Sequence, residues 1–122
     1  TVSKNMEISF LLDFYGDMLT EKQRSMVDYY YNEDLSLAEI AENEGITRQG
    51  VRDSIKRAEA QLLEMEERLA LAARFRRMQE ELLTVQENAR MLRAVNDRNG
   101  RIPEIEECAA KIAAAADRMA EA

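Results

Sequence analysis

The stretch LSLAEIAENEGITRQGVRDSIKRA, residues 35–58, decides the fold. Ser36 and Thr47 each stand where a hydroxyl group can cap a helix, and Gly45 stands where a left-handed residue would end the first one. Ala41 offers the small side chain that a crossing of the two helices would need. Two helices joined by a short turn that contains glycine are typical of a helix-turn-helix. We therefore predict a helix-turn-helix over this stretch.

The composition of the whole chain predicts an all-α protein. Its 122 residues include only four Gly and one Pro, while 46% are hydrophobic, so helix breakers are scarce and a core is feasible. Thr20 is followed three residues later by Gln23, and Ser36 by Glu39. This spacing predicts a capping box at the start of the two helices that begin there. Ahead of the helix-turn-helix, the sequence indicates helices over about residues 7–15 and 20–31.

A long apolar ladder follows the turn, with steps of three and four residues. It consists of Val51, Ile55, Ala58, Leu62, Met65, Leu69, Ala72, Phe75, Met78, Leu82, Val85, Ala89, Leu92 and Val95. No Pro or Gly interrupts the ladder before Gly100, so one helix over residues 48–96 would be about 70 Å long. The segment from Asn96 to Pro103 is the clearest break, and a last Ala-rich helix is expected over residues 104–120.

The ladder predicts two parts: a helix-turn-helix head over residues 1–73, which includes the start of the long helix, and long C-terminal helices over residues 74–122. The apolar stripe of these helices must be covered. A homodimer would cover it through Leu62, Met65, Leu69, Phe75, Met78, Leu82 and Val85. The competing solution is a monomer in which a bend near residues 72–76 lets the later helices pack back on the stripe.

Charge points to a nucleic-acid interface at the start of the long helix. The net charge of −7 argues against a protein that coats nucleic acid indiscriminately. Residues 47–57, however, carry four basic side chains against Asp53 alone. We expect contacts to phosphates and base edges, to DNA first and RNA second, from Thr47, Arg48, Gln49, Arg52, Lys56 and Arg57. The alternative is a solvated helix face with pairs such as Asp53 to Arg57.

The residues that are missing exclude most enzyme classes. The chain has no His and a lone Cys108, so Ser/His pairs, Cys/His pairs and imidazole metal sites cannot be built. The acidic residues Glu104, Glu106 and Glu107 suit the first turn of a helix better than a metal site. We expect no enzyme, no cofactor and no metal. No apolar run reaches membrane length and no signal peptide is visible, which predicts a cytoplasmic protein without a membrane partner.

Several of these segments resemble known families. LTEKQR (residues 19–24), together with residues 35–41, 45–47 and 51–58, is similar to region 4 of bacterial sigma factors. NMEISFLLDFYGDMLT (residues 5–20) and ITRQGVRDSIKRAE (residues 46–59) resemble the YlxM family of small Gram-positive bacterial proteins, closely over about residues 5–75. The genes of that family lie beside those of the signal recognition particle and its receptor. The resemblance implies a DNA-binding regulatory protein of the protein-targeting pathway, or alternatively an interaction protein that docks on signal recognition particle protein or RNA without binding DNA.

Overall fold

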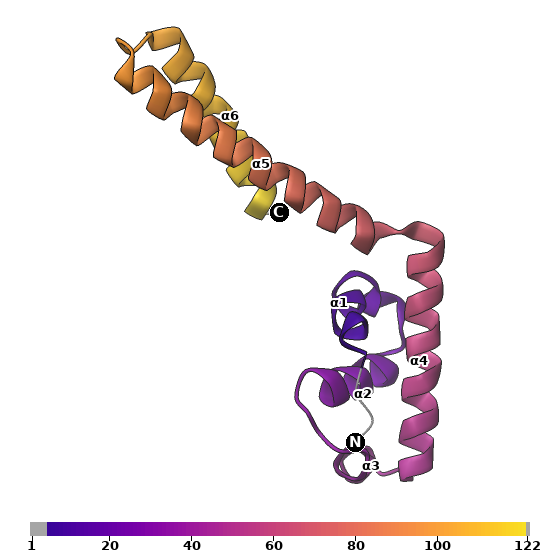
Figure 1. Ribbon diagram of the computed structural model, residues 1–122. Helices are drawn as coiled ribbons and strands as arrows, with labels where there is room; N and C mark the ends of the chain where they lie inside the picture. The colour runs from indigo at the N-terminus through magenta and orange to yellow at the C-terminus, as the bar shows by residue number, and fades with distance from the viewer. Residues whose placement is uncertain (1–4, 122) are drawn as a thin grey trace. The chain divides into compact units, whose positions relative to one another are not determined.

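The computed structural model describes residues 5–121, and these residues form helices without any strand (Figure 1). In chain order the elements are α1 (Met6–Tyr15), the 3₁₀ turn η1 (Gly16–Met18), α2 (Glu21–Tyr31), α3 (Leu37–Glu44), α4 (Arg48–Leu69), α5 (Leu71–Arg98) and α6 (Pro103–Glu121). The predicted all-α class is confirmed. The chain divides into two compact units, one ending at Ala73 and the other beginning at Arg74.

The helices of the N-terminal unit begin where their caps were predicted. At α2, Thr20 Oγ1 accepts a hydrogen bond from the Gln23 amide at 3.2 Å, and Gln23 Oε1 accepts from the Thr20 amide at 3.1 Å. At α3, the same reciprocal pair joins Ser36 and Glu39, with both bonds at 3.1 Å. Donation by the amide and the hydroxyl of Ser36 holds the pKa of Glu39 below its usual value. Both capping boxes are confirmed.

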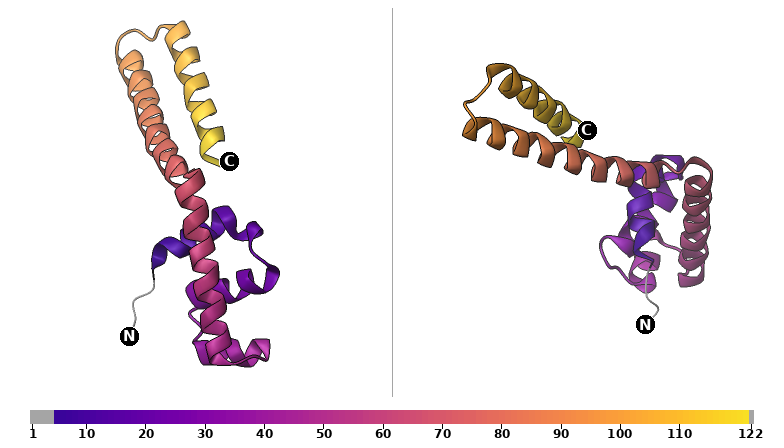
Figure 2. Two further views of the ribbon diagram at one scale, coloured as in Figure 1. Left: turned by 90° about the vertical axis from the view of Figure 1, so that its right-hand side faces the viewer. Right: turned by 45° about the horizontal axis from the view of Figure 1, so that its top comes forward.

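The core of this unit lies where α4 runs along α1, α2 and α3 (Figure 2, left). Ala41 of α3 is buried, as expected for a small side chain at a helix crossing. The side chains buried most deeply come from all four helices: Ile8, Leu11, Val27, Ile40, Val51 and Leu62. The part of the apolar ladder from Val51 to Leu62 is therefore buried in the head itself.

The uninterrupted helix over residues 48–96 does not form, and the chain breaks at Ala70, close to the segment where the sequence allowed a bend. Helix α4 ends at Leu69, and Ala70 adopts a left-handed conformation with φ 54° and ψ 29° before α5 begins at Leu71. Such a conformation costs an ordinary residue about 1–2 kcal/mol. Alanine is also the strongest helix former, so nothing in the local sequence signals a break here.

Tyr15 and Glu66 hold this break together. The Tyr15 hydroxyl donates to Glu66 Oε1 at 2.7 Å and accepts from the Leu71 amide at 3.1 Å. The Glu66 carboxylate also accepts from the amides of Ala72 and Ala73, both at 3.0 Å. Free amides in a first helical turn need such acceptors. A buried tyrosine from α1 and a carboxylate from α4 thus cap the start of α5.

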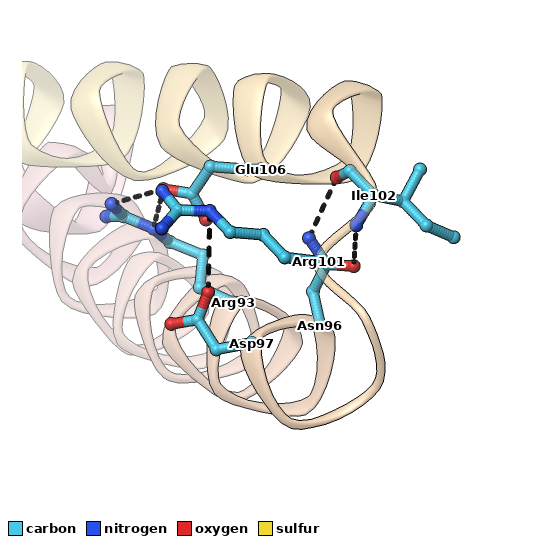
Figure 3. Close-up of polar contacts among 6 residues, drawn as sticks. All are labelled: Arg93, Asn96, Asp97, Arg101, Ile102 and Glu106. Carbon is cyan, nitrogen blue, oxygen red and sulfur yellow. Dashed lines mark hydrogen bonds and ion pairs between the residues drawn. The ribbon is translucent and has the colours of Figure 1, made fainter.

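The C-terminal unit is an antiparallel hairpin of α5 and α6 (Figures 1 and 2). The turn between the helices is closed by Asn96, whose amide side chain donates to the Ile102 carbonyl and accepts from the Ile102 amide, both at 2.9 Å (Figure 3). Arg93 pairs with Glu106 at 2.7 Å across the same end. The predicted break between Asn96 and Pro103 is confirmed.

The dimer surface drawn from the sequence is wrong at two of its seven positions. Leu62 is buried in the core of the head, and Leu82 is buried in the C-terminal unit. Neither side chain is available to a second chain. The continuous stripe predicted over both halves of the ladder is therefore interrupted, while Leu69, Phe75, Met78 and Val85 stay exposed.

Replacing Tyr15 with Phe tests the cap of α5. The variant should lose about 1–3 kcal/mol of unfolding free energy, because the partly buried Leu71 amide loses its acceptor. Urea unfolding followed by circular dichroism measures the change. Tyr29→Phe is the matched control, since among the described residues the Tyr29 hydroxyl has no hydrogen bond. Equal losses in the two variants would contradict the cap.

Ala41→Leu tests the helix crossing. Three added carbon atoms at a closed crossing should cost roughly 1–3 kcal/mol through overpacking. Ala38→Leu adds the same atoms to an exposed position of α3 and should leave the melting temperature nearly unchanged. If both variants melt alike, the crossing does not depend on a small residue.

Candidate nucleic-acid interface

The turn between α3 and α4 has the geometry of a helix-turn-helix. Gly45 adopts a left-handed conformation with φ 69°, which a side chain would make unfavourable. The amide of Gly45 and that of Ile46 both donate to the Ala41 carbonyl, the latter at 3.1 Å. These two bonds end α3 and direct the chain into Thr47, the first residue of the predicted site.

Thr47 caps α4 and leaves a donor-rich helix start. Its hydroxyl oxygen accepts from the Gly50 amide at 3.0 Å. A Cβ atom on Gly50 would lie only 3.2 Å from that oxygen, so a glycine here lets the cap close. In the described part of the chain, the amides of Arg48 and Gln49 have no acceptor. Free amides and the helix dipole together favour a phosphate at this point.

Three of the four predicted cations lie along one strip of α4. Arg48, Arg52 and Lys56 are spaced by four residues, so each is displaced by only about 40° around the helix from the one before. Arg57 lies about 100° beyond Lys56 and faces a different side. All four are exposed. The structure thus brings Arg48, Arg52 and Lys56 together and separates Arg57 from them.

A hollow of about 480 Å³ lies at the head of this strip. Thr47, Arg48, Gln49 and Arg52 line it, together with Leu37 from the start of α3. Leu37 is not among the residues predicted for the site, because an apolar residue beside a cap is usually assigned to the core. Its half-buried side chain also packs against the core of the head, and no signal in the sequence distinguishes such a rim position from a core position.

Asp53 does not pair with Arg57, so that expectation is wrong. Its carboxylate instead accepts from Gln49 Nε2 at 2.9 Å, across one helical turn. Within residues 5–121, Arg48, Arg52, Lys56 and Arg57 form no ion pair. Glu64 and Arg68, further along α4, do pair at 3.1 Å. The cations of the site are therefore available to an external anion, whereas Gln49 must first release Asp53.

Other kinds of site are not indicated by the part of the chain that the structure describes. No cluster of carboxylate or thiol side chains there could hold a metal ion. None of the described helices combines the length and the apolar character that a membrane crossing needs.

Comparison with known proteins gives one consistent result. The model of the UPF0122 family, described as "Putative helix-turn-helix protein, YlxM / p13 like", matches residues 2–101. A UPF0122 protein of Halalkalibacterium halodurans is 46% identical over 86 residues, which cover 70% of this chain and 79% of that protein. Another, from Desulforamulus reducens, is 47% identical over 79 residues, 65% of this chain and 68% of the relative. A third, from Bacillus cereus, is 49% identical over 78 residues, 64% of this chain and 71% of the relative. The family description names a fold and no catalytic activity.

Thr47→Ala tests the cap that shapes the helix start. The variant should unfold about 1 kcal/mol more easily, because the Gly50 amide loses its acceptor. Thr47→Ser retains the hydroxyl and should retain most of the stability. Chemical denaturation of the three proteins measures the difference, and an alanine variant as stable as the parent would show that the cap contributes nothing.

Proposed function

The chain belongs to the UPF0122 family of YlxM / p13-like helix-turn-helix proteins, and on that premise we propose that its N-terminal unit binds nucleic acid through the start of α4. Duplex DNA is the first candidate. The observation that carries the proposal is the strip of exposed cations at the start of α4, which form no ion pair with any described residue and lie beside amides that likewise have no described acceptor, in a chain whose net charge is −7.

Each residue of the strip has a role that its position allows. The free amides of Arg48 and Gln49 approach a backbone phosphate, while the Thr47 hydroxyl keeps the helix start in place. The guanidinium groups of Arg48 and Arg52 reach the edges of bases in the major groove or the phosphates beside them. Lys56 contacts the backbone one turn further on. Arg57 faces elsewhere and adds attraction without a defined contact.

The acidity of the remaining chain suits selective binding. A protein with a net charge of −7 gains little from a polyanion except where cations are concentrated. Binding is then limited to the orientation in which the strip faces the nucleic acid. The charge distribution therefore favours a specific site over general coating of DNA.

The alternative function is an interaction protein of the signal recognition particle pathway. The same cations and amides would donate hydrogen bonds to the phosphates of a folded RNA. Recognition of such an RNA depends on shape more than on base edges. A regulatory part in protein targeting and a cytoplasmic location rest on the family resemblance and the sequence, and both stay predictions.

Replacing both Arg48 and Arg52 with Ala tests the interface. Each removed phosphate contact should lower the magnitude of the log-log salt slope for duplex DNA by about 0.9. Because both side chains are exposed, the melting temperature should stay unchanged. The control is Arg74→Ala with Arg77→Ala, which removes the same charge from exposed positions of α5.

The three proteins are titrated with duplex DNA and with structured RNA over a range of salt concentrations. Weaker binding of DNA in the α4 variant alone supports the proposal. Binding of RNA without DNA, lost in the same variant, supports the alternative function. Equal weakening in the control, or no salt-dependent binding at all, contradicts both.

A further inference from the structure

The hairpin of α5 and α6 has two sets of apolar positions, and folding of the hairpin buries only one of them. In α5, the spacing of three and four residues defines two sets at intervals of seven, one with Leu82 and Ala89 and the other with Met78, Val85 and Leu92. In α6, the corresponding sets are Ala109 with Ala116, and Ile105 with Ile112 and Met119. An alternating spacing of three and four is the pattern of helices that pack on more than one neighbour in a coiled coil or bundle.

The first set is buried between the two helices of the hairpin. Leu82, Ala89, Ala109 and Ala116 are between 0% and 7% exposed. Three of these four are alanine, so the two helices close on each other with small side chains. The larger side chains of the second set are left outside: Met78 is 53% exposed, Val85 40%, Leu92 44%, Ile112 44% and Met119 50%.

The members of the second set lie on one side of the hairpin. Polar bonds mark the opposite side: Arg93 to Glu106 at 2.7 Å and Gln86 to Asp117 at 2.8 Å. Three of these polar residues, Gln86, Arg93 and Glu106, each come directly after a member of the second set. Their side chains are therefore rotated by about 100° around the helix from that member. In an antiparallel pair, corresponding flanks of the two helices share a side. We call the resulting surface the outer stripe, formed by Met78, Val85, Leu92, Ile105, Ile112 and Met119.

We propose that the outer stripe is a self-association surface, covered by the outer stripe of a second copy of this chain in a four-helix bundle of two hairpins. Its exposed side chains present on the order of 400 Å² of apolar surface, within the roughly 300–600 Å² of the largest patches on monomers, which are often functional. Two such stripes facing each other would cover on the order of 800 Å² of apolar surface in total, the size of a weak, reversible interface. A two-fold interface uses the same surface on both subunits. Two outer stripes, with the same seven-residue spacing, meet this requirement.

Charge favours a second copy over a charged partner. Residues 74–122 carry nine basic and nine acidic side chains, a net charge of zero, so the whole net charge of −7 lies in residues 1–73. Two neutral hairpins approach each other without net repulsion. A nucleic acid or an anionic membrane would instead be expected to meet a basic rim.

Self-association through the outer stripe is independent of nucleic-acid binding and holds whether or not α4 binds DNA. It replaces the dimer surface expected from the sequence, since it brings in α6 and leaves out Leu62 and Leu82, which are buried. If both proposals hold, the dimer carries two recognition helices, as paired half-sites on DNA require.

Sedimentation equilibrium of the full chain at micromolar concentrations tests the outer stripe. The parent should sediment at twice the 14.0 kDa of one chain. Val85→Glu with Ile112→Glu should weaken association at least about 100-fold and give the single-chain mass, because two carboxylates would be buried against apolar surface. The control, Met91→Glu with Ala114→Glu, adds the same charges to exposed positions off the stripe and should remain dimeric.

A second measurement needs no variant and so does not depend on whether the charged hairpin folds. The melting temperature of the parent should rise with protein concentration, because the dimer is linked to folding by mass action. A parent that is monomeric throughout, with a melting temperature independent of concentration, overturns the proposal. So does a folded stripe variant that dimerises as well as the control. Neither result bears on DNA binding by α4.

Discussion

The hydrogen bond between Tyr15 and Glu66 is the interaction on which both halves of this protein depend. The apolar ladder from Val51 to Val95 has no helix breaker, and local preferences favour one continuous helix. Tyr15 and Glu66 provide acceptors for three successive amides and so make a break at Ala70 favourable despite its left-handed conformation. Burial, and then the neighbouring Glu66, raise the pKa of Tyr15, so its hydroxyl remains a donor throughout the neutral range.

The break divides one amphipathic pattern between two different kinds of packing. Before Ala70, the ladder lies on α4, and α1, α2 and α3 pack against it to form a core. Bulky side chains such as Ile55 and Leu62 are buried there. After it, the ladder meets a single Ala-rich helix, which buries small side chains and leaves large ones outside. A two-helix unit cannot enclose both of its heptad sets, and this geometric limit is why the hairpin retains an apolar face.

The distribution of charge matches the same division. The acidic excess lies entirely in residues 1–73, and there the start of α4 is the exception, with cations that make no ion pair in the described part of the chain. The hairpin is neutral. A concentrated basic strip on an acidic head restricts how a polyanion can approach, while a neutral hairpin places no electrostatic barrier before association. The proposed nucleic-acid binding and the proposed self-association thus belong to units that differ in charge as well as in packing.

The sequence by itself determined the features that depend on neighbouring residues: the all-α class, the capping boxes at Thr20 and Ser36, the turn at Gly45, and the break between Asn96 and Pro103. It also placed the basic residues of the candidate site on α4, because helix spacing follows from residue number alone. Only the tertiary structure decided the break at Ala70, whose partners Tyr15 and Glu66 are 51 residues apart. The bond of Asp53 with Gln49 in place of Arg57 is a local choice between two partners one helical turn away, and residue spacing alone allows both. Caps and turns are short-range and visible in sequence, whereas a break stabilised by partners far apart in the chain is decided only when the fold brings them within hydrogen-bonding distance.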